Sequence, residues 1–461
     1  MATTLEHCQI HPSPITDHEL SLPLTHFDIP FLQSDPTQRL IFFDHPISKP
    51  HFMQTIVPQL KNSLALVLTR FLPLAGNIIF PTSGRPVIRY ALGNSISLTI
   101  SECDNDFHHL TGNHQREADE FYSCVPQLPP TTRLSDDSIL LPVVALKITL
   151  FPEKGICIGL TNYHALADGS SIINFMKTWA LLNRFGSNIH VIDEKYFPSF
   201  DRTMVQDEEG LDSRAWNLVN KSRAFPIEPP PRPSLIFPIN KVRATFIMTK
   251  NQVQSLKEYV LANRPNIGHI SSFLVICAYI WTCSEKSVHS AGVETNNDEP
   301  VYFSFAADCR ARLNPPLPQN YFGNCVVFVA AQSRHGLIKG NEGFVIAAKS
   351  IADAIKKTLY SEKGILDGSD WPVDFKRFSG RRVISVAGSP RFDVYEVDYG
   401  WGNPKKHEFV HLDREKSISL CKSREFEGGF EIGLSRTKVE MDVFEGLFNQ
   451  GLEMFSCSKL I

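Results

Sequence analysis

The chain has 461 residues, with 46 Lys and Arg against 49 Asp and Glu, which gives a formal net charge of −3. A near-neutral chain without a cluster of basic residues is not expected to bind nucleic acid, and the length predicts about two to three domains. The longest uninterrupted apolar run, residues 273–281, is far shorter than the roughly 20 residues that span a bilayer, so we expect no membrane partner.

The first half of the chain alternates short apolar runs with helical patterns. Residues 51–72 carry apolar side chains at helical spacing and run to Pro73, which predicts one helix that ends there. Residues 143–151 and 156–160 alternate on either side of a turn, which predicts a hairpin. We also expect strands at 20–30, 38–44, 87–90 and 95–100, a loop with a short helix at 103–137, and a helix at 170–183.

Residues 185–240 show weak periodicity and include the proline-rich segment 225–233, which disfavours regular structure. We therefore predict a crossover linker at 191–240 between an N-terminal domain, 1–190, and a C-terminal domain, 241–461. Because strands and helices are mixed in both halves, the predicted fold class is α/β. In the second half we expect strands at 244–248, 301–307, 325–331, 382–387, 394–398, 409–412 and 430–434, and helices at 252–263, 271–283, 343–359 and 439–455.

The termini and the cysteines indicate a cytoplasmic protein. The first residues lack the basic and apolar segments of a signal peptide. The triplet Ser458-Lys459-Leu460 resembles a peroxisomal address, but Ile461 follows it. The ten cysteines are scattered and form no C-x-x-C pair, so we expect reduced thiols, no disulfide framework and no metal site.

The stretch NYHALADGS, residues 162–170, lies where the expected hairpin strand gives way to a helix. His164 at the end of a buried strand could take up a proton near neutral pH, and Asp168 could orient it. The structural alternative is that Asp168 caps the helix and that His164 is a core residue, since sixteen histidines make about one such spacing by chance. Gly169, which has no side chain, leaves room for a ligand beside the histidine.

Two further stretches are unusual. In VDYGWGNP, residues 397–404, Gly400 and Gly402 flank Trp401 and predict a tight loop, although a turn with a buried tryptophan explains them equally well. Arg310 and Arg312 follow an expected strand and could anchor carboxylates, or they could lie on the surface. We find no G-x-S-x-G, P-loop or H-E-x-x-H signature in the chain.

Together these stretches resemble the plant BAHD acyl-CoA-dependent acyltransferases, whose hallmarks are H-x-x-x-D near residue 165 and D-F-G-W-G near residue 400. The similarity covers essentially the whole chain, with one departure: Tyr399 stands where the family has Phe. The segment Tyr321–Cys325, YFGNC, is typical of the anthocyanin and flavonoid glycoside acyltransferases, a branch that includes the malonyltransferases. Further matching segments are LPLT at 22–25, PLAG at 73–76 and SVAGSP at 385–390.

The resemblance implies two domains like chloramphenicol acetyltransferase subunits, each a mixed β-sheet with helices, and an active-site channel between them. A segment after about residue 398 would return to the N-terminal domain. The implied enzyme is a monomer without a bound cofactor. It takes acyl-CoA, with malonyl-CoA favoured, as co-substrate and a phenolic glycoside as acceptor.

The resemblance also implies roles for the residues of the three stretches. His164 would be the general base, and Asp168 would be structural and paired with Arg310. Asp398 would hold its loop or take part in catalysis, and the Trp401 indole N–H would be a candidate donor to the oxyanion. Gly169, Gly400 and Gly402 would shape the backbone around the site.

Coenzyme A carries phosphates, so basic residues and helix starts in the second half are candidate contacts. These candidates are Lys250, Lys257, Ser271 and Ser272, and the alternative for both lysines is a solvated helix face. The sequence leaves three other functions open: a hydroxycinnamoyl donor with the same acceptors, transfer to an amine, and a non-catalytic protein of the same fold.

Overall fold

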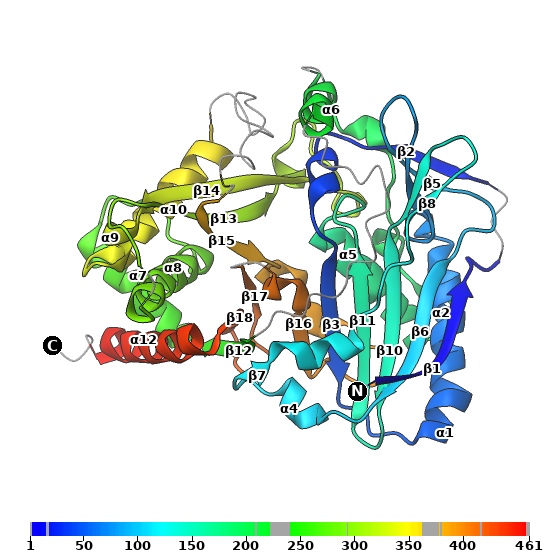
Figure 1. Ribbon diagram of the computed structural model, residues 1–461, viewed down its shortest axis with the longest axis horizontal. Coiled ribbons are helices and arrows are strands. Elements are labelled where there is room, and N and C mark those ends of the chain that lie inside the picture. Colours follow the sequence, from blue (N-terminus) through cyan, green and yellow to red (C-terminus); the bar gives the residue numbers. More distant parts are fainter. Residues whose placement is uncertain are drawn as a thin grey trace.

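The computed structural model describes residues 2–14, 18–207, 210–221, 240–292, 294–361, 378, 380–414 and 417–457. Within these residues the chain forms two large mixed sheets, one in each half, and a smaller third sheet (Figure 1). Helices accompany the strands in both halves, which confirms the predicted α/β class. The proline-rich segment 225–233 lies outside the described residues.

The first sheet has six strands and contains the predicted hairpin. The hairpin pairs antiparallel from Val144 with Asn162 to Phe151 with Gly155, as the alternating sequence predicted. The strand order is β1 (Ala2–Ile10), β6 (Ile96–Cys103), β10 (Val144–Phe151), β11 (Gly155–Asn162), β3 (Thr37–Phe43) and β16 (Lys406–Phe409).

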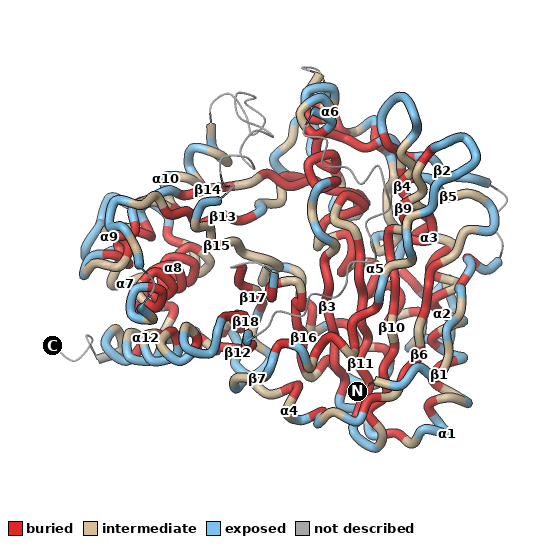
Figure 2. Tube along the Cα trace, viewed as in Figure 1, coloured by how far each residue is buried: buried red, intermediate tan, exposed pale blue. Residues whose placement is uncertain are grey.

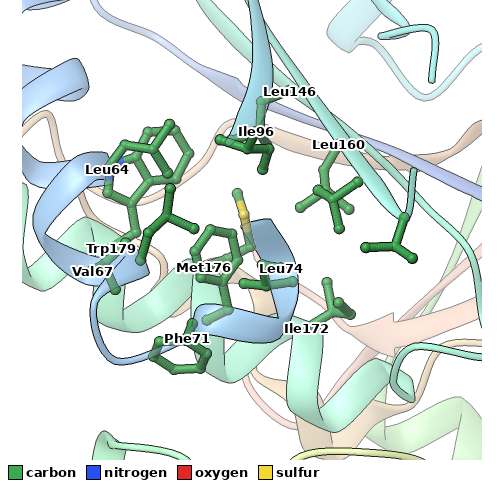
Figure 3. Packing of buried hydrophobic residues seen from close by; sticks show 14 of the residues in the cluster. Leu64, Val67, Phe71, Leu74, Ile96, Leu146, Leu160, Ile172, Met176 and Trp179 are labelled. Atoms are coloured by element: carbon green, nitrogen blue, oxygen red, sulfur yellow. The ribbon is translucent and has the colours of Figure 1, made fainter. Parts of the chain in front are cut away.

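One face of this sheet packs against α2 (Val57–Leu68) and α5 (Gly169–Arg184). Figure 3 shows Leu64 and Trp179 from the two helices beside Leu146 and Leu160 from the strands. The Trp179 indole donates a hydrogen bond to the Ser63 hydroxyl at 3.1 Å, so the buried polar atom of the ring is satisfied. This core fixes β11 and the start of α5, the two elements on either side of His164.

The second sheet belongs mainly to the C-terminal half. Its order is β14 (Val326–Arg334), β13 (Pro300–Asp308), β15 (Arg382–Ala387), β17 (Ile418–Lys422), β18 (Phe430–Thr437), β12 (Lys241–Met248) and β7 (Arg116–Glu117). The helices that share its core are α7 (Lys250–Asn263), α8 (Ser272–Ser290), α10 (Gly343–Leu359) and α12 (Lys438–Cys457). In Figure 2 the buried residues of α8 lie between these helices and the sheet.

The third sheet has five short strands and covers one end of the first half. Its order is β2 (Leu20–Pro23), β5 (Val87–Tyr90), β4 (Asn77–Phe80), β9 (Ile139–Pro142) and β8 (Thr132–Arg133). The remaining described α-helices are short, apart from α6: α1 (Lys49–His51), α3 (Leu72–Ala75), α4 (Phe107–Thr111), α6 (Leu211–Lys221) and α9 (His335–Lys339). No helix of the described chain combines the length and apolar character needed to span a membrane.

The two large sheets exchange strands. Strand β16 leaves the C-terminal half and pairs antiparallel with β3 at the edge of the first sheet, with Phe409 opposite Arg39. In return, β7 from the N-terminal half pairs with β12 of the second sheet. After β16 the chain re-enters the second sheet as β17 and β18. The two halves are therefore interlocked at these two strands.

Several sequence predictions of local structure are wrong, including the strand at 409–412, where Val410–Asp413 form a 3-10 helix. No helix was predicted in the linker 191–240, but α6 forms there because Leu211, Ala215 and Val219 make one apolar face, which packs near the 3-10 helix Ile29–Gln33. Residues 394–398 were predicted as a strand and instead form a 3-10 turn. The turn follows Asp393, whose φ of +48° is incompatible with an extended strand.

Candidate active site

His164 lies in the turn between β11 and α5, and its ring is half-buried. The imidazole stacks on the Phe31 ring, with centroids 3.9 Å apart and an interplanar angle of 16°. The carbonyl of His164 accepts a hydrogen bond from Asn324 Nδ2 at 2.9 Å. Ring and backbone are thus both held, which limits the directions in which the imidazole can point.

The surroundings of His164 favour its neutral form. Burial is the main cause that lowers the pKa of His164 below its usual 6.5, and the charge of Arg39 lowers it further. The charge of Asp168 and the side chain of Asn324 act in the opposite direction but do not cancel the burial. Nδ1 is buried without a hydrogen-bond partner in the described chain, which leaves Nε2 for proton exchange with a substrate. A neutral imidazole at neutral pH can act as a general base.

Asp168 is fully engaged in structural contacts. Its carboxylate caps α5 by accepting from the Ser171 N–H at 3.0 Å, and it also accepts from the Cys325 N–H at 3.2 Å. The Arg310 guanidinium lies 2.8 Å from the same carboxylate, and both side chains are buried. Burial alone would raise the pKa of Asp168, but Arg310 and these hydrogen bonds hold it below its ordinary value. Asp168 therefore both caps α5 and pairs with Arg310.

Arg310 connects the two halves of the chain at this point. Besides Asp168, it contacts Asp308 at 3.1 Å and donates to the carbonyls of Tyr321 and Gly323 at 3.1 and 3.2 Å. The segment 321–325 is thus fastened to the start of α5. Arg310 is completely buried, so the surface position that the sequence left open for it is excluded.

Asn324 belongs to a second buried network, which contacts the backbone of His164. Its Nδ2 donates to Asp28 Oδ1 at 2.9 Å as well as to the His164 carbonyl, and its backbone N–H donates to the same Asp28 oxygen at 3.0 Å. The other Asp28 oxygen accepts from the N–H and the hydroxyl of Thr25 at 3.0 and 2.9 Å. Asp28 and Asn324 are completely buried, so this network sets where the backbone of His164 lies.

Gly169 does not leave room for a ligand. A Cβ atom at Gly169 would come within 2.7 Å of the Phe392 ring, which occupies the space beside the backbone there. The glycine is required for the close approach of this ring, so our prediction of open space was wrong.

The loop after residue 397 is held together by Asp398. Its Oδ1 accepts from the N–H groups of Gly400 and Gly402 at 2.8 and 2.9 Å, and its Oδ2 lies 2.9 Å from Arg184 at the end of α5. Both glycines have positive φ, +98° and +86°, which explains the residue type at these positions. Asp398 is therefore occupied by its own loop and is not directed at His164.

Trp401 is far from the reacting position, so we correct its proposed role. Its indole packs against Phe43 and His45, with ring centroids 5.4 and 5.5 Å away. Phe43 ends β3, whereas Thr37, which pairs with Asn162 beside His164, begins it. Six residues of strand separate the two ends by about 20 Å, so the Trp401 N–H cannot reach an oxyanion at His164. Trp401 supports the fold.

The candidate coenzyme A contacts lie on two helices of the second half. Lys250 begins α7, and Lys257 lies two turns later on the same face of that helix. Ser271 caps α8 by accepting from the Leu274 N–H at 3.2 Å, and Ser272 is the first residue of α8. Their role in binding stays a prediction.

A cavity of about 300 Å³ lies at the junction of the two large sheets, away from His164. Its polar groups bond mainly to one another: Asn113 donates to Glu425 at 3.1 Å, and the Tyr395 hydroxyl donates to Glu431 at 2.5 Å. His164 and the residues that contact it do not line this cavity, so we treat it as separate from the candidate site.

Four residues around His164 were not singled out from the sequence: Asp28, Phe31, Arg39 and Asn324. Asn324 lies inside the YFGNC segment, but its amide contacts follow only from the tertiary structure. Arg39 did give a signal, because it is a charged residue inside the apolar run 38–44. Asp28 and Phe31 reach the site from a distant part of the chain and leave no local pattern.

Known proteins that are similar to the chain are transferases. A family model described as the Transferase family matches residues 1–450. The chain is 43% identical over 456 residues to phenolic glucoside malonyltransferase 1 of Nicotiana tabacum, across 98% of this chain and 99% of that protein. It is 39% identical to the malonyl-coenzyme:anthocyanin 5-O-glucoside-6'''-O-malonyltransferase of Salvia splendens, across 98% and 95%.

Among solved structures, the crystal structure of vinorine synthase has a similar fold. The TM-score is 0.68, and the match covers 96% of both chains. With 20% sequence identity, this likeness concerns the fold alone.

Proposed function

The chain belongs to the Transferase family, the acyl-CoA-dependent acyltransferases that its motifs resemble, and on this basis we propose that it moves a malonyl group from malonyl-CoA to a sugar hydroxyl of a phenolic glucoside. The observation that carries the proposal is His164. It is a half-buried histidine at a strand end, held by the Phe31 ring and the Asn324 amide and kept in its neutral form. The malonyl donor and the glucoside acceptor rest on the similarity to the two malonyltransferases.

In the proposed reaction His164 removes the proton from the acceptor hydroxyl as that oxygen attacks the thioester carbonyl of malonyl-CoA. The new C–O bond forms, the C–S bond breaks, and the protonated imidazole returns its proton to the departing thiolate. The products are the malonyl ester and free coenzyme A. The thioester is already activated, so no acyl-enzyme is needed when both substrates are held together.

We further propose that Lys250 and Lys257 hold the phosphates of coenzyme A, with Ser271 and Ser272 at the start of α8. The support is chemical, because two cations on one helix face and a helix start suit a polyphosphate. Replacing both lysines by Ala should raise KM for malonyl-CoA and leave kcat nearly unchanged. A fall in kcat with KM unchanged would contradict this role.

The test of the whole proposal is a His164→Ala variant assayed for coenzyme A release by thiol titration, with malonyl-CoA and a flavonoid glucoside. We expect kcat to fall by about 10² to 10⁴-fold while the variant keeps its thermal stability. A folded variant that retains near-normal turnover would exclude His164 as the general base. His190→Ala, at an exposed histidine, is the matched control and should behave as wild type.

A panel of donors and acceptors separates the alternatives. Wild-type enzyme that uses coumaroyl-CoA in preference to malonyl-CoA would exclude the malonyl donor and keep acyl transfer. Preference for a polyamine over the glucoside would exclude the sugar hydroxyl as acceptor. Failure to release coenzyme A with any pair would favour a non-catalytic protein of this fold.

We also propose that the enzyme works as a monomer in the cytoplasm. The nine cysteines that the structure describes are all free thiols, which suits a reducing compartment. Light scattering of the purified protein should give the mass of a single chain, and a dimer mass at assay concentrations would contradict the monomer.

A further inference from the structure

Arg39 is a buried cation to which the described residues offer no carboxylate partner. It lies in the middle of β3, is 4% exposed, and stands between Leu160 of β11 and Phe409 of β16. Its Nε and Nη1 atoms are buried and form no hydrogen bond with any residue that the structure describes. The guanidinium carbon lies 5.6 Å from the centroid of the Phe409 ring, a cation–π contact.

Three other buried arginines of the described chain lie against carboxylates, while Arg202 donates to the Tyr321 hydroxyl and Arg436 to the Ser435 carbonyl. Arg116 lies 2.9 Å from Glu408, Arg243 lies 3.0 Å from Glu408 and 2.5 Å from Asp413, and Arg310 lies 2.8 Å from Asp168. Removing a charge from water without a counter-charge is costly, which is why such groups are normally paired. Arg39 has no carboxylate partner, and its buried Nε and Nη1 have no acceptor among the described residues, so its burial carries a cost that needs an explanation.

The groups around Arg39 offer no negative charge. Burial lowers the pKa of Arg39 to about 10, so the guanidinium is still charged at neutral pH, and no described carboxylate acts on it. The charge of Arg39 lowers the pKa of His164, His407 and His411. Burial and this charge together lower the pKa values of His407 and His411 to about 3. All three rings are therefore neutral at pH 7. Among the described residues, the region around Arg39 is therefore positive and contains no carboxylate that pairs with it.

Arg39 is also close to the reacting position. It pairs across the sheet with Leu160, four residues before His164. Thr37 pairs with Asn162, the last residue of β11. It lies two residues, or about 7 Å, along the strand from Arg39. An extended arginine side chain can cover that distance. An anion bound by Arg39 would thus lie next to the general base rather than at a remote surface.

We propose that Arg39 binds the free carboxylate of the acyl group and so selects a dicarboxylic half-thioester such as malonyl-CoA over neutral donors. This inference rests on the proposed function and names a residue for its donor preference. A guanidinium can hold a carboxylate through two parallel hydrogen bonds, which would fix the acyl chain in one direction. The carboxylate of malonyl-CoA would in turn supply the charge that Arg39 lacks.

The test compares wild type with Arg39→Met and Arg39→Lys, using malonyl-CoA and acetyl-CoA, which differ by one carboxylate. For Arg39→Met we expect kcat/KM with malonyl-CoA to fall by about 100-fold and kcat/KM with acetyl-CoA to change by less than about 5-fold. For Arg39→Lys we expect a value of kcat/KM with malonyl-CoA between those of wild type and Arg39→Met, because lysine keeps the charge but cannot form the two parallel hydrogen bonds. Arg334→Met, at an exposed arginine paired with Asp298, is the matched control and should leave both donors unchanged.

Thermal unfolding distinguishes binding from a structural role. If Arg39 serves to bind the acyl carboxylate, Arg39→Met removes a buried charge without a described partner. The melting temperature of the free enzyme should then be unchanged or higher. Malonyl-CoA should then stabilise wild type more than Arg39→Met, whereas coenzyme A should stabilise both equally. A lowered melting temperature together with equal losses for both donors would overturn the proposal.

Different results would contradict the proposed function and the role of Arg39. Wild-type enzyme that uses malonyl-CoA well, with Arg39→Met keeping its preference for malonyl-CoA over acetyl-CoA, would overturn the role of Arg39 and leave the proposed function intact. Wild-type enzyme that prefers a neutral donor would overturn both the malonyl donor and Arg39, while acyl transfer at His164 would stand.

Discussion

At the scale of single residues, His164 and Asp168 make different kinds of contact in the site. The carboxylate of Asp168 is used by the cap of α5, by the Cys325 N–H and by Arg310, so it has no free direction toward a substrate. His164 is held instead by Phe31 and by the Asn324 amide. We therefore expect Asp168 to influence catalysis only through the position of the loop.

We predict that Asp168→Ala lowers both stability and activity. The variant removes the buried partner of Arg310 and leaves it only the part-exposed Asp308, which should cost about 3 to 5 kcal/mol of unfolding free energy. Denaturant unfolding and coenzyme A release measured on the same sample check this. Asp168→Asn keeps the capping oxygen and should lose less stability. Normal stability with no turnover would show that Asp168 takes part in the chemistry directly.

The protonation of His164 makes a second prediction. A base is active when neutral, and burial lowers the pKa of His164 below 6.5, so activity is lost only as the pH falls through that lowered pKa. The profile of kcat/KM against pH should be level through neutrality, with an acid limb centred below 6.5. The Arg39→Met variant should shift this limb upward, because the arginine charge helps to keep the ring neutral. A limb centred above 6.5 would contradict the role of burial.

The sequence could predict those features of the site whose residues lie close together along the chain. The pair of His164 and Asp168 lies within five residues, and Arg310 was recognisable through the family motifs. Trp401 was misjudged because its motif gives no information about which end of β3 it packs against. The position of Phe31 beside His164 is purely tertiary, and no local spacing contains it.

At the scale of elements, α5 joins the two hallmark motifs of the chain. Asp168 caps its first turn, and Arg184 in its last turn pairs with Asp398 of the glycine loop. Asn183 also donates to the Tyr399 carbonyl at 2.8 Å. The two motifs, more than 200 residues apart in the sequence, thus lie at opposite ends of one helix. This explains how a loop far from His164 can matter for its position.

We predict that Asp398→Ala destabilises the protein without removing catalysis. The carboxylate satisfies two backbone N–H groups, so its loss should cost about 2 kcal/mol, while the half-exposed Arg184 adds little. Thermal unfolding should show the loss, and kcat well below the melting temperature should fall by less than about 10-fold. Glu396→Ala, at the exposed partner of Lys177, is the control and should change neither. Abolished turnover in a stable Asp398→Ala protein would contradict a purely structural loop.

Among the elements, strong periodicity decided which predictions succeeded. Helix α10 spans Gly343–Leu359 and strand β15 spans Arg382–Ala387, the ranges predicted from the sequence. Strand β1 was not predicted, because most of its side chains are polar and at least partly exposed, and it exists through pairing with β6. Helix α6 was obscured by the prolines that follow it, although its own apolar spacing is regular.

At the scale of the whole molecule, the exchanged strands carry a buried ion network that joins the two halves. Glu408 lies on β16 in the first sheet, and it binds Arg116 on β7 and Arg243 on β12, both in the second sheet. Arg243 also reaches Asp413, just beyond β16. All four side chains are almost completely buried. The halves are thus held by paired charges as well as by backbone pairing, so we expect them to unfold together.

We predict that Glu408→Gln uncouples the halves and changes the response to acid. Two arginines would lose a buried partner, which should cost about 3 to 5 kcal/mol. Burial alone would raise the pKa of Glu408, but Arg116 and Arg243 lower it from 4.5 to about 2. The stability that it contributes is therefore complete above pH 4.5 and is lost as the pH falls toward 2.

Acid titrations at fixed denaturant should show this loss in wild type. They should show a shallower dependence between pH 4.5 and 2 in Glu408→Gln. Glu396→Gln, at an exposed glutamate, should follow the wild-type curve. If the halves are coupled through Glu408, unfolding should be a single transition in wild type and should broaden or split in the variant. An unchanged acid slope and a single sharp transition in Glu408→Gln would mean that backbone pairing of β16 and β7 alone joins the halves.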